Sequence, residues 1–179
     1  MQKRRTNIPT TLITSEGKLT EVVIGFLVGG FGFSESSLRN TVWKYGPGNF
    51  IYDHSKPNAI TWFNKVYYAE IWSNEDNIAI WMRYIVHEQR HRYDIDISGG
   101  IRFYTSYLQD YFQQKRNVKE AHQAYLNIYW EELAYSDEYL MADILTKTDF
   151  LEQWEGLLET NPSFSAGFEL GKKYFLNKF

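Results

Sequence analysis

The chain of 179 residues contains no cysteine. Disulfide bonds, thiolate nucleophiles, iron–sulfur clusters and cysteine-ligated zinc are therefore excluded, and a transition-metal site must use histidine and carboxylate ligands. Histidine is also scarce, because the sequence has only four: His54, His87, His91 and His122. Histidine-based chemistry is consequently confined to a few positions.

A large charge of one sign and a long apolar run are missing as well. The net charge of −3 and the isoelectric point near 5.8 give no overall positive field, so we expect no nucleic-acid partner. The longest apolar run, residues 22–33, is shorter than the roughly 20 residues that a membrane-spanning helix needs. Charged residues separate it from the basic cluster at residues 3–5, which is unlike a signal peptide. We therefore expect no transmembrane helix and no signal peptide, and a protein that is cytoplasmic or exported by a non-classical route.

Aromatic side chains, in contrast, are abundant and make up 18% of the sequence. The length fits one domain with an aromatic-rich core, and we predict a flexible N-terminal tail over residues 1–15 and a single domain over residues 16–179. Hydrophobic patterns predict strands at residues 41–45, 59–61 and 65–71, and helices at residues 19–27, 76–97, 101–115, 118–145, 150–158 and 165–176. The predicted fold class is α+β, mostly α, with a small N-terminal antiparallel sheet packed on a helical core.

Residues 87–91 read HExxH, and they fall well inside the helix predicted over residues 76–97. At 100° per residue, His87 and His91 lie about 40° apart and one turn from each other, so both imidazoles can reach one cation. Glu88 projects beside them and can act as a general base without being a ligand. The other two histidines, His54 and His122, are interpreted as ordinary loop or surface residues.

A site with two histidines needs a third protein ligand, and four carboxylates compete for this role: Asp94, Glu131, Glu132 and Glu138. Ligation by Asp94 requires a strained reach along the same helix. The helix predicted over residues 118–145 is the better source, because Glu131, Tyr135 and Glu138 share one of its faces. Glu131 and Glu132 point about 100° apart, so only one of them can face the metal. A plain solvated helix face is the competing interpretation of this row.

The chain resembles a known family at four places. They are Phe31-Gly32 before Val42; Ala59-Ile60-Thr61 with Asn64, Val66 and Tyr67; His87–His91; and Ala124-Tyr125 with Ile128, Glu131 and Ala134-Tyr135. From about Leu19 onward it is similar to the metallopeptidase domain of extracellular contractile injection systems and related polymorphic-toxin proteins. The resemblance implies a zincin-like fold and a gluzincin-like Zn²⁺ site, with His87, His91 and Glu131 as ligands and Glu88 as base.

Arg90 departs from that family, which usually has a small residue at this position. A guanidinium about 60° round the helix from His87 weakens metal binding unless Asp94 or a carboxylate of the helix at residues 118–145 neutralises it. The sequence therefore predicts metal binding more firmly than full catalytic activity.

These features predict a zinc-dependent peptidase that acts on a peptide or protein substrate, with Tyr135 or Tyr125 as a donor to the oxyanion. An alternative is a catalytically inactive domain that binds metal or a protein partner in a secretion- or toxin-type assembly. A third hypothesis, an aromatic platform for carbohydrate, leaves the HExxH motif as a coincidence and ranks last.

Overall fold

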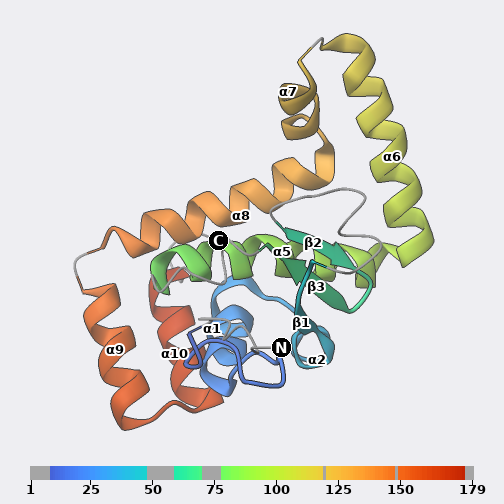
Figure 1. Ribbon diagram of the computed structural model, residues 1–179. Coiled ribbons are helices and arrows are strands. Elements are labelled where there is room, and N and C mark those ends of the chain that lie inside the picture. Colours follow the sequence, from blue (N-terminus) through green and yellow to red (C-terminus); the bar gives the residue numbers. More distant parts are fainter. Residues whose placement is uncertain (1–8, 48–58, 70–77, 119, 148, 176–179) are drawn as a thin grey trace.

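The computed structural model describes residues 9–47, 59–69, 78–118, 120–147 and 149–175 (Figure 1). Helices dominate this part of the chain, and three short strands form a small sheet beside them. The predicted class, α+β and mostly α, is confirmed. The position of His54 lies outside the described residues.

The sheet is mixed, which corrects the expectation of an antiparallel one. Strands β2 (Ala59–Trp62) and β3 (Lys65–Tyr68) pair antiparallel across the tight turn at residues 63–64. Strand β1 (Val42–Tyr45) lies on the other side of β3 and runs parallel to it, so the order is β1-β3-β2. A two-residue turn enforces antiparallel pairing only between the strands it joins, and β1 reaches the sheet through a longer connection.

The first helix is longer than predicted. Helix α1 (Glu21–Phe31) continues through Gly29 and ends at Gly32, which has a left-handed φ of 68°. The glycines inside α1 therefore do not end the helix. They lie where α1 packs closely against helix α10 (Phe164–Phe175). A Cβ atom added at Gly25 would lie 2.0 Å from the Phe164 carbonyl oxygen, and one at Gly167 would lie 2.1 Å from the Val22 carbonyl oxygen.

The core is rich in aromatic residues, as the composition predicts. Phe26 contacts the rings of Phe150, Trp154 and Phe175, which come from α10 and from helix α9 (Phe150–Thr160). Leu12 and Ile13 fall within the predicted tail, but both are buried in this core. Apolar side chains at these two positions provide the burial that orders the segment.

Two long helices lie side by side across the middle of the molecule (Figure 1): α5 (Ile78–Ser98) and α8 (Tyr129–Leu145). The helix predicted over residues 118–145 is in fact two helices, α7 (Ala121–Leu126) and α8. The helical course is broken at Ile128, whose backbone is extended. Apolar periodicity runs through this break, so the periodic pattern alone does not reveal it.

Helix α6 (Gly100–Asn117) leaves the end of α5 at Gly99, which has a φ of 82°, and projects together with α7 as a hairpin (Figure 1). Only Phe103 of α6 is buried. Helix α2 (Glu35–Asn40) directly precedes β1 and contacts α5, away from the α6–α7 hairpin (Figure 1).

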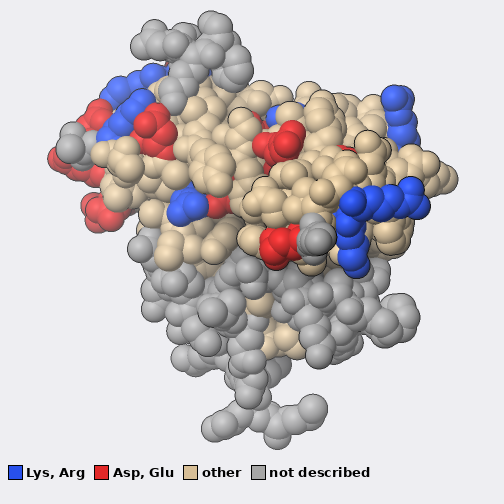
Figure 2. All heavy atoms as spheres, turned by 90° about the horizontal axis from the view of Figure 1, so that it is seen from above, with Lys and Arg blue, Asp and Glu red and all other residues tan. Residues whose placement is uncertain are grey.

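On the face shown in Figure 2, the charged side chains are interspersed rather than sorted by sign. On the face seen from above, Lys and Arg alternate with Asp and Glu, and the described part of that face carries no continuous basic area (Figure 2). Nor does any helix within the described ranges combine the length and apolar character needed to cross a membrane.

Candidate metal centre

Helix α5 changes character along its length. Its first half buries apolar residues, Trp81, Met82, Ile85 and Val86, against the core. Its second half buries polar ones: His87, Glu88, Gln89, His91, Arg92 and Asp94. Buried polar groups are costly unless they find partners, so this half of α5 must be matched by polar groups from other elements.

Two of those groups, His87 and His91, converge with a residue from α8. Ligand atoms of His87, His91 and Glu131 lie within 4.8 Å of one another. The Nε2 atom of His87 is 3.4 Å from Glu131 Oε2, and the Nε2 atom of His91 is 3.4 Å from Glu131 Oε1. The exposed fractions of the three residues are 7%, 6% and 2%, in the same order. Two imidazole nitrogens and a carboxylate form a donor set of the kind found in catalytic zinc sites.

The hydrogen bonding of this cluster also fits a cation. The Oε2 atom of Glu131 is buried and has no hydrogen-bond partner among the described residues. A buried carboxylate oxygen without a donor is unfavourable, and a metal ion is one group that would satisfy it. The three residues can therefore hold a metal ion.

Without a metal, the electrostatics are those of a buried ion pair. Burial opposes protonation of His87, but its contacts with Glu131 and Glu138 outweigh burial and raise its pKa to about 10. Burial likewise raises the pKa of Glu131, but His91 and His87 outweigh it and hold the pKa of that carboxyl well below its usual range. The carboxylates of the site thus stabilise a positive charge, which either a proton or a metal ion can supply.

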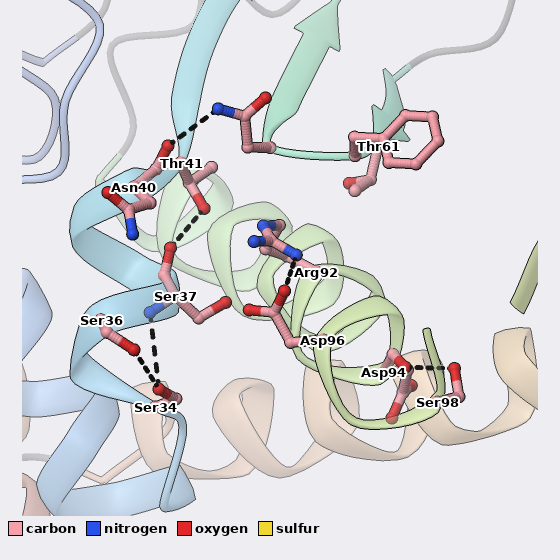
Figure 3. Close-up of polar contacts among 12 residues, drawn as sticks. Ser34, Ser36, Ser37, Asn40, Thr41, Thr61, Arg92, Asp94, Asp96 and Ser98 are labelled. Atoms are coloured by element: carbon pink, nitrogen blue, oxygen red, sulfur yellow. Dashed lines mark hydrogen bonds and ion pairs between the residues drawn. The ribbon is translucent and has the colours of Figure 1, made fainter. Parts of the chain in front are cut away.

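Glu88 is held from the sheet. The Thr61 hydroxyl of β2 donates to Glu88 Oε2 at 2.6 Å, and the Glu88 carbonyl oxygen is 3.2 Å from the same hydroxyl. Both residues are buried. Thr61 lies beside the second half of α5 in Figure 3, where the Arg92–Asp96 pair and the Ser98 hydroxyl on the Asp94 carbonyl also stabilise the helix. The Glu88 side chain is therefore tied to a strand as well as to its own helix.

Glu138 supports His87 from the far side of the ring. Its Oε2 atom is 3.2 Å from His87 Nδ1, while Nε2 of the same ring faces Glu131. Arg83 in turn contacts Glu138 Oε1 at 2.7 Å. A carboxylate on the outer nitrogen fixes the orientation of a ligating imidazole. Glu138 is therefore within ion-pair distance of His87, although Nδ1 makes no hydrogen bond of good geometry, and Glu138 is not part of the converging ligand group.

The positive charge of Arg90 is matched by two carboxylates. Its Nε is 3.1 Å from both oxygens of Asp94, and its Nη1 is 3.1 Å from Asp137 Oδ2 on α8. Burial lowers the pKa of Arg90, but Asp94 and Asp137 outweigh it and raise that pKa. This is the neutralisation that the sequence requires for Arg90 to be compatible with a nearby dication. Asp94 is engaged by Arg90 and is not in the ligand cluster.

Among the remaining candidates, Glu132 is exposed and His122 is exposed at the start of α7. The Tyr135 ring is edge-on to His87, with centroids 4.7 Å apart. Burial and the charge of Glu131 raise the pKa of Tyr135 to about 12 and that of Tyr125 well above its usual range. Both hydroxyls therefore stay protonated at neutral pH and can donate.

Sequence reasoning assigned no role to Tyr107 or Thr61. The Tyr107 hydroxyl of α6 donates to Glu131 Oε1 at 2.6 Å. The sequence spacing predicts neither this contact nor the one between Thr61 and Glu88, because each joins elements that are far apart in the chain. Thr61 does fall within the stretch that carries the family resemblance, which was the one available hint.

In comparisons with known proteins, no family model, no curated protein and no solved structure matches the chain.

Proposed function

We propose that the chain is a zinc-dependent metallopeptidase of the gluzincin type. His87, His91 and Glu131 would hold the ion, and Glu88 would serve as general base. The observation that carries the proposal is that these three residues bring their ligand atoms within 4.8 Å of one another, with Glu88 next to His87 on the same helix. The similarity in sequence to the core domain of contractile injection systems supports the same assignment.

The residues divide the chemistry between them. A bound Zn²⁺ would polarise the scissile carbonyl and lower the pKa of a water molecule to about 7. Glu88 would accept a proton from water, with Oε1 as the freer oxygen because Oε2 accepts from Thr61, and would pass it to the leaving amine. Tyr135, protonated because its pKa is about 12, is the candidate donor to the developing oxyanion.

The partners follow from this chemistry. The substrate class is a peptide or protein, and a protein partner in a larger assembly is the second interaction we propose. For location we propose the cytoplasm or export by a non-classical route.

One observation favours a second function, a metal-binding domain without catalysis. Glu88 is only 5% exposed and Glu131 only 2% exposed, so substrate reaches the site only if neighbouring groups move. A domain that uses the ion to brace α5 against α8 would retain metal and cleave nothing.

The test is elemental analysis of protein purified without added metal, followed by cleavage of a labelled casein and a mixed peptide library. We expect one zinc per chain, and we expect Glu88→Gln to retain zinc while cleavage falls at least 100-fold. His87→Ala should lose the metal.

Glu132→Gln is the matched control on α8, because Glu132 is exposed next to Glu131. It should leave both zinc and cleavage unchanged, whereas Glu131→Gln should lose zinc. Absence of metal in the unmodified protein would refute both candidate functions. Stoichiometric zinc without cleavage would select the second.

A further inference from the structure

The first turn of α8, which carries Glu131, is held by α6 through consecutive contacts. The Asp110 Oδ2 atom accepts from the backbone N–H of Tyr129 at 2.7 Å. The Trp130 indole donates to the Ser106 hydroxyl at 2.9 Å. Tyr107 donates to the next residue, Glu131, at 2.6 Å. Three successive residues of α8 are therefore each bonded to one residue of α6.

The break before α8 leaves the direction of this helix and the backbone N–H groups of its first turn to be fixed by contacts with other elements. Because the chain leaves the helical course at Ile128, the direction of α8 is not inherited from α7. The acidic Asp110 supplies the acceptor that the first turn of α8 lacks within its own sequence, since Ile128 has no side-chain cap. The first turn of α8 is thus held by α6 in addition to the packing of α8 against α5.

Tyr107 also distinguishes the two oxygens of Glu131. Its hydroxyl holds Oε1, while Oε2 is buried, has no hydrogen-bond partner among the described residues and lies 3.4 Å from His87 Nε2.

We propose that Tyr107 is the positioning residue for the third metal ligand: by holding Glu131 Oε1 from α6, it leaves Oε2 as the oxygen available to the metal. This inference rests on the metal site of the proposed function, but not on peptide cleavage. It gives the α6–α7 hairpin a direct connection to the ligand set.

The experiment compares Tyr107→Phe with the unmodified protein. The substitution removes only the hydroxyl and keeps the ring that packs near Phe103. We expect zinc affinity, measured by competition with a chromophoric chelator, to fall about 10-fold, within the range found when the partner of a metal ligand is lost. In the cobalt-loaded protein, we expect the visible ligand-field bands to change in intensity, because Oε1 loses the donor that Tyr107 supplies.

Two control variants separate positioning from general loosening of the hairpin. Ser106→Ala removes the neighbouring bond between α6 and α8 without touching Glu131. Tyr111→Phe removes a hydroxyl one turn further along α6, where no hydrogen bond joins it to the described residues. Both should keep the zinc affinity and the cobalt spectrum of the unmodified protein.

Unchanged affinity and spectrum in Tyr107→Phe would overturn the inference, and so would equal changes in Tyr107→Phe and Ser106→Ala. If the unmodified protein binds neither zinc nor cobalt, the proposed metal site fails and this inference fails with it. If it binds metal and cleaves nothing, only the peptidase assignment fails, and the comparison of variants still decides the role of Tyr107.

Discussion

The Glu88 carboxylate has little access to water, so its position depends on donors within the protein. Thr61 is such a donor, from a strand that reaches the site only through the fold. Such a contact restricts the rotation of the carboxylate and leaves one oxygen free to accept a proton. The same bond also contributes to stability, because a buried acceptor without its donor is costly.

Replacing Thr61 with valine, which has the same shape without the hydroxyl, should therefore destabilise the fold by about 1.5–3 kcal/mol. Thr61→Ser, which keeps the donor, should lose less. The measurement is urea unfolding of the metal-free proteins, followed by tryptophan fluorescence. If the valine variant unfolds at the same urea concentration as the unmodified chain, the bond contributes nothing to stability.

The residues of the site differ in how far the sequence predicts them. His87, Glu88 and His91 are predictable, because their geometry is set within two turns of one helix. Glu131 was one of several carboxylates by spacing and was selected by the family resemblance. The structure brings it to the two histidines. Tyr107 and Thr61 were not predictable, because their contacts arise from packing between elements that are distant in the chain.

At the scale of elements, the predicted helices and strands mostly agree with the observed ones, and the differences have identifiable causes. The break at Ile128 interrupts an apolar pattern that continues on both sides, so periodicity alone predicts one helix. The continuation of α1 through Gly29 has the opposite origin. Glycine usually marks a helix end, but here it allows α10 to approach closely.

The approach of α1 to α10 gives a prediction for this pair of helices. Gly25→Ala should destabilise the protein by about 1–3 kcal/mol, because the new methyl group would lie 2.0 Å from the Phe164 carbonyl oxygen and the helices must separate. Gly156→Ala on α9 is the matched control. A Cβ there meets nothing within 4 Å, so the same change should stabilise by about 0.5–1 kcal/mol.

Chemical denaturation of both glycine variants checks the prediction. Opposite signs support close packing as the reason for glycine at position 25. A loss of stability in both would instead indicate that alanine is unfavourable throughout these helices, and no loss at Gly25 would show that the two helices separate freely.

At the scale of the whole molecule, the site couples folding, protons and metal. In the metal-free protein, contacts with Glu131 and Glu138 raise the pKa of His87 to about 10, from an ordinary value of 6.5 in the unfolded chain. The stabilisation from protonated His87 is thus complete below pH 6.5, declines as the pH rises, and is lost above about pH 10. Its slope approaches ~1.4 kcal/mol per pH unit between these limits.

Metal reverses the sign of this dependence. Zinc binds the neutral imidazole, so it must displace the proton of His87, and its affinity rises with pH up to about 10. We therefore expect the metal-free protein to lose unfolding free energy from pH 7 to pH 9, and the additional stability conferred by zinc to increase over the same range. The measurement is denaturant unfolding at fixed free zinc and with a chelator.

Substitutions at two histidines isolate the group responsible. His87→Gln should remove both pH trends, because it removes the proton and the ligand together. His122→Ala, at an exposed position of α7, should keep both. A metal-free stability that rises between pH 7 and pH 9, or one whose pH dependence matches that of His87→Gln, would mean that Glu131 and Glu138 do not hold a proton on His87. In that case the buried charges of α5 and α8 would have to be balanced by another group.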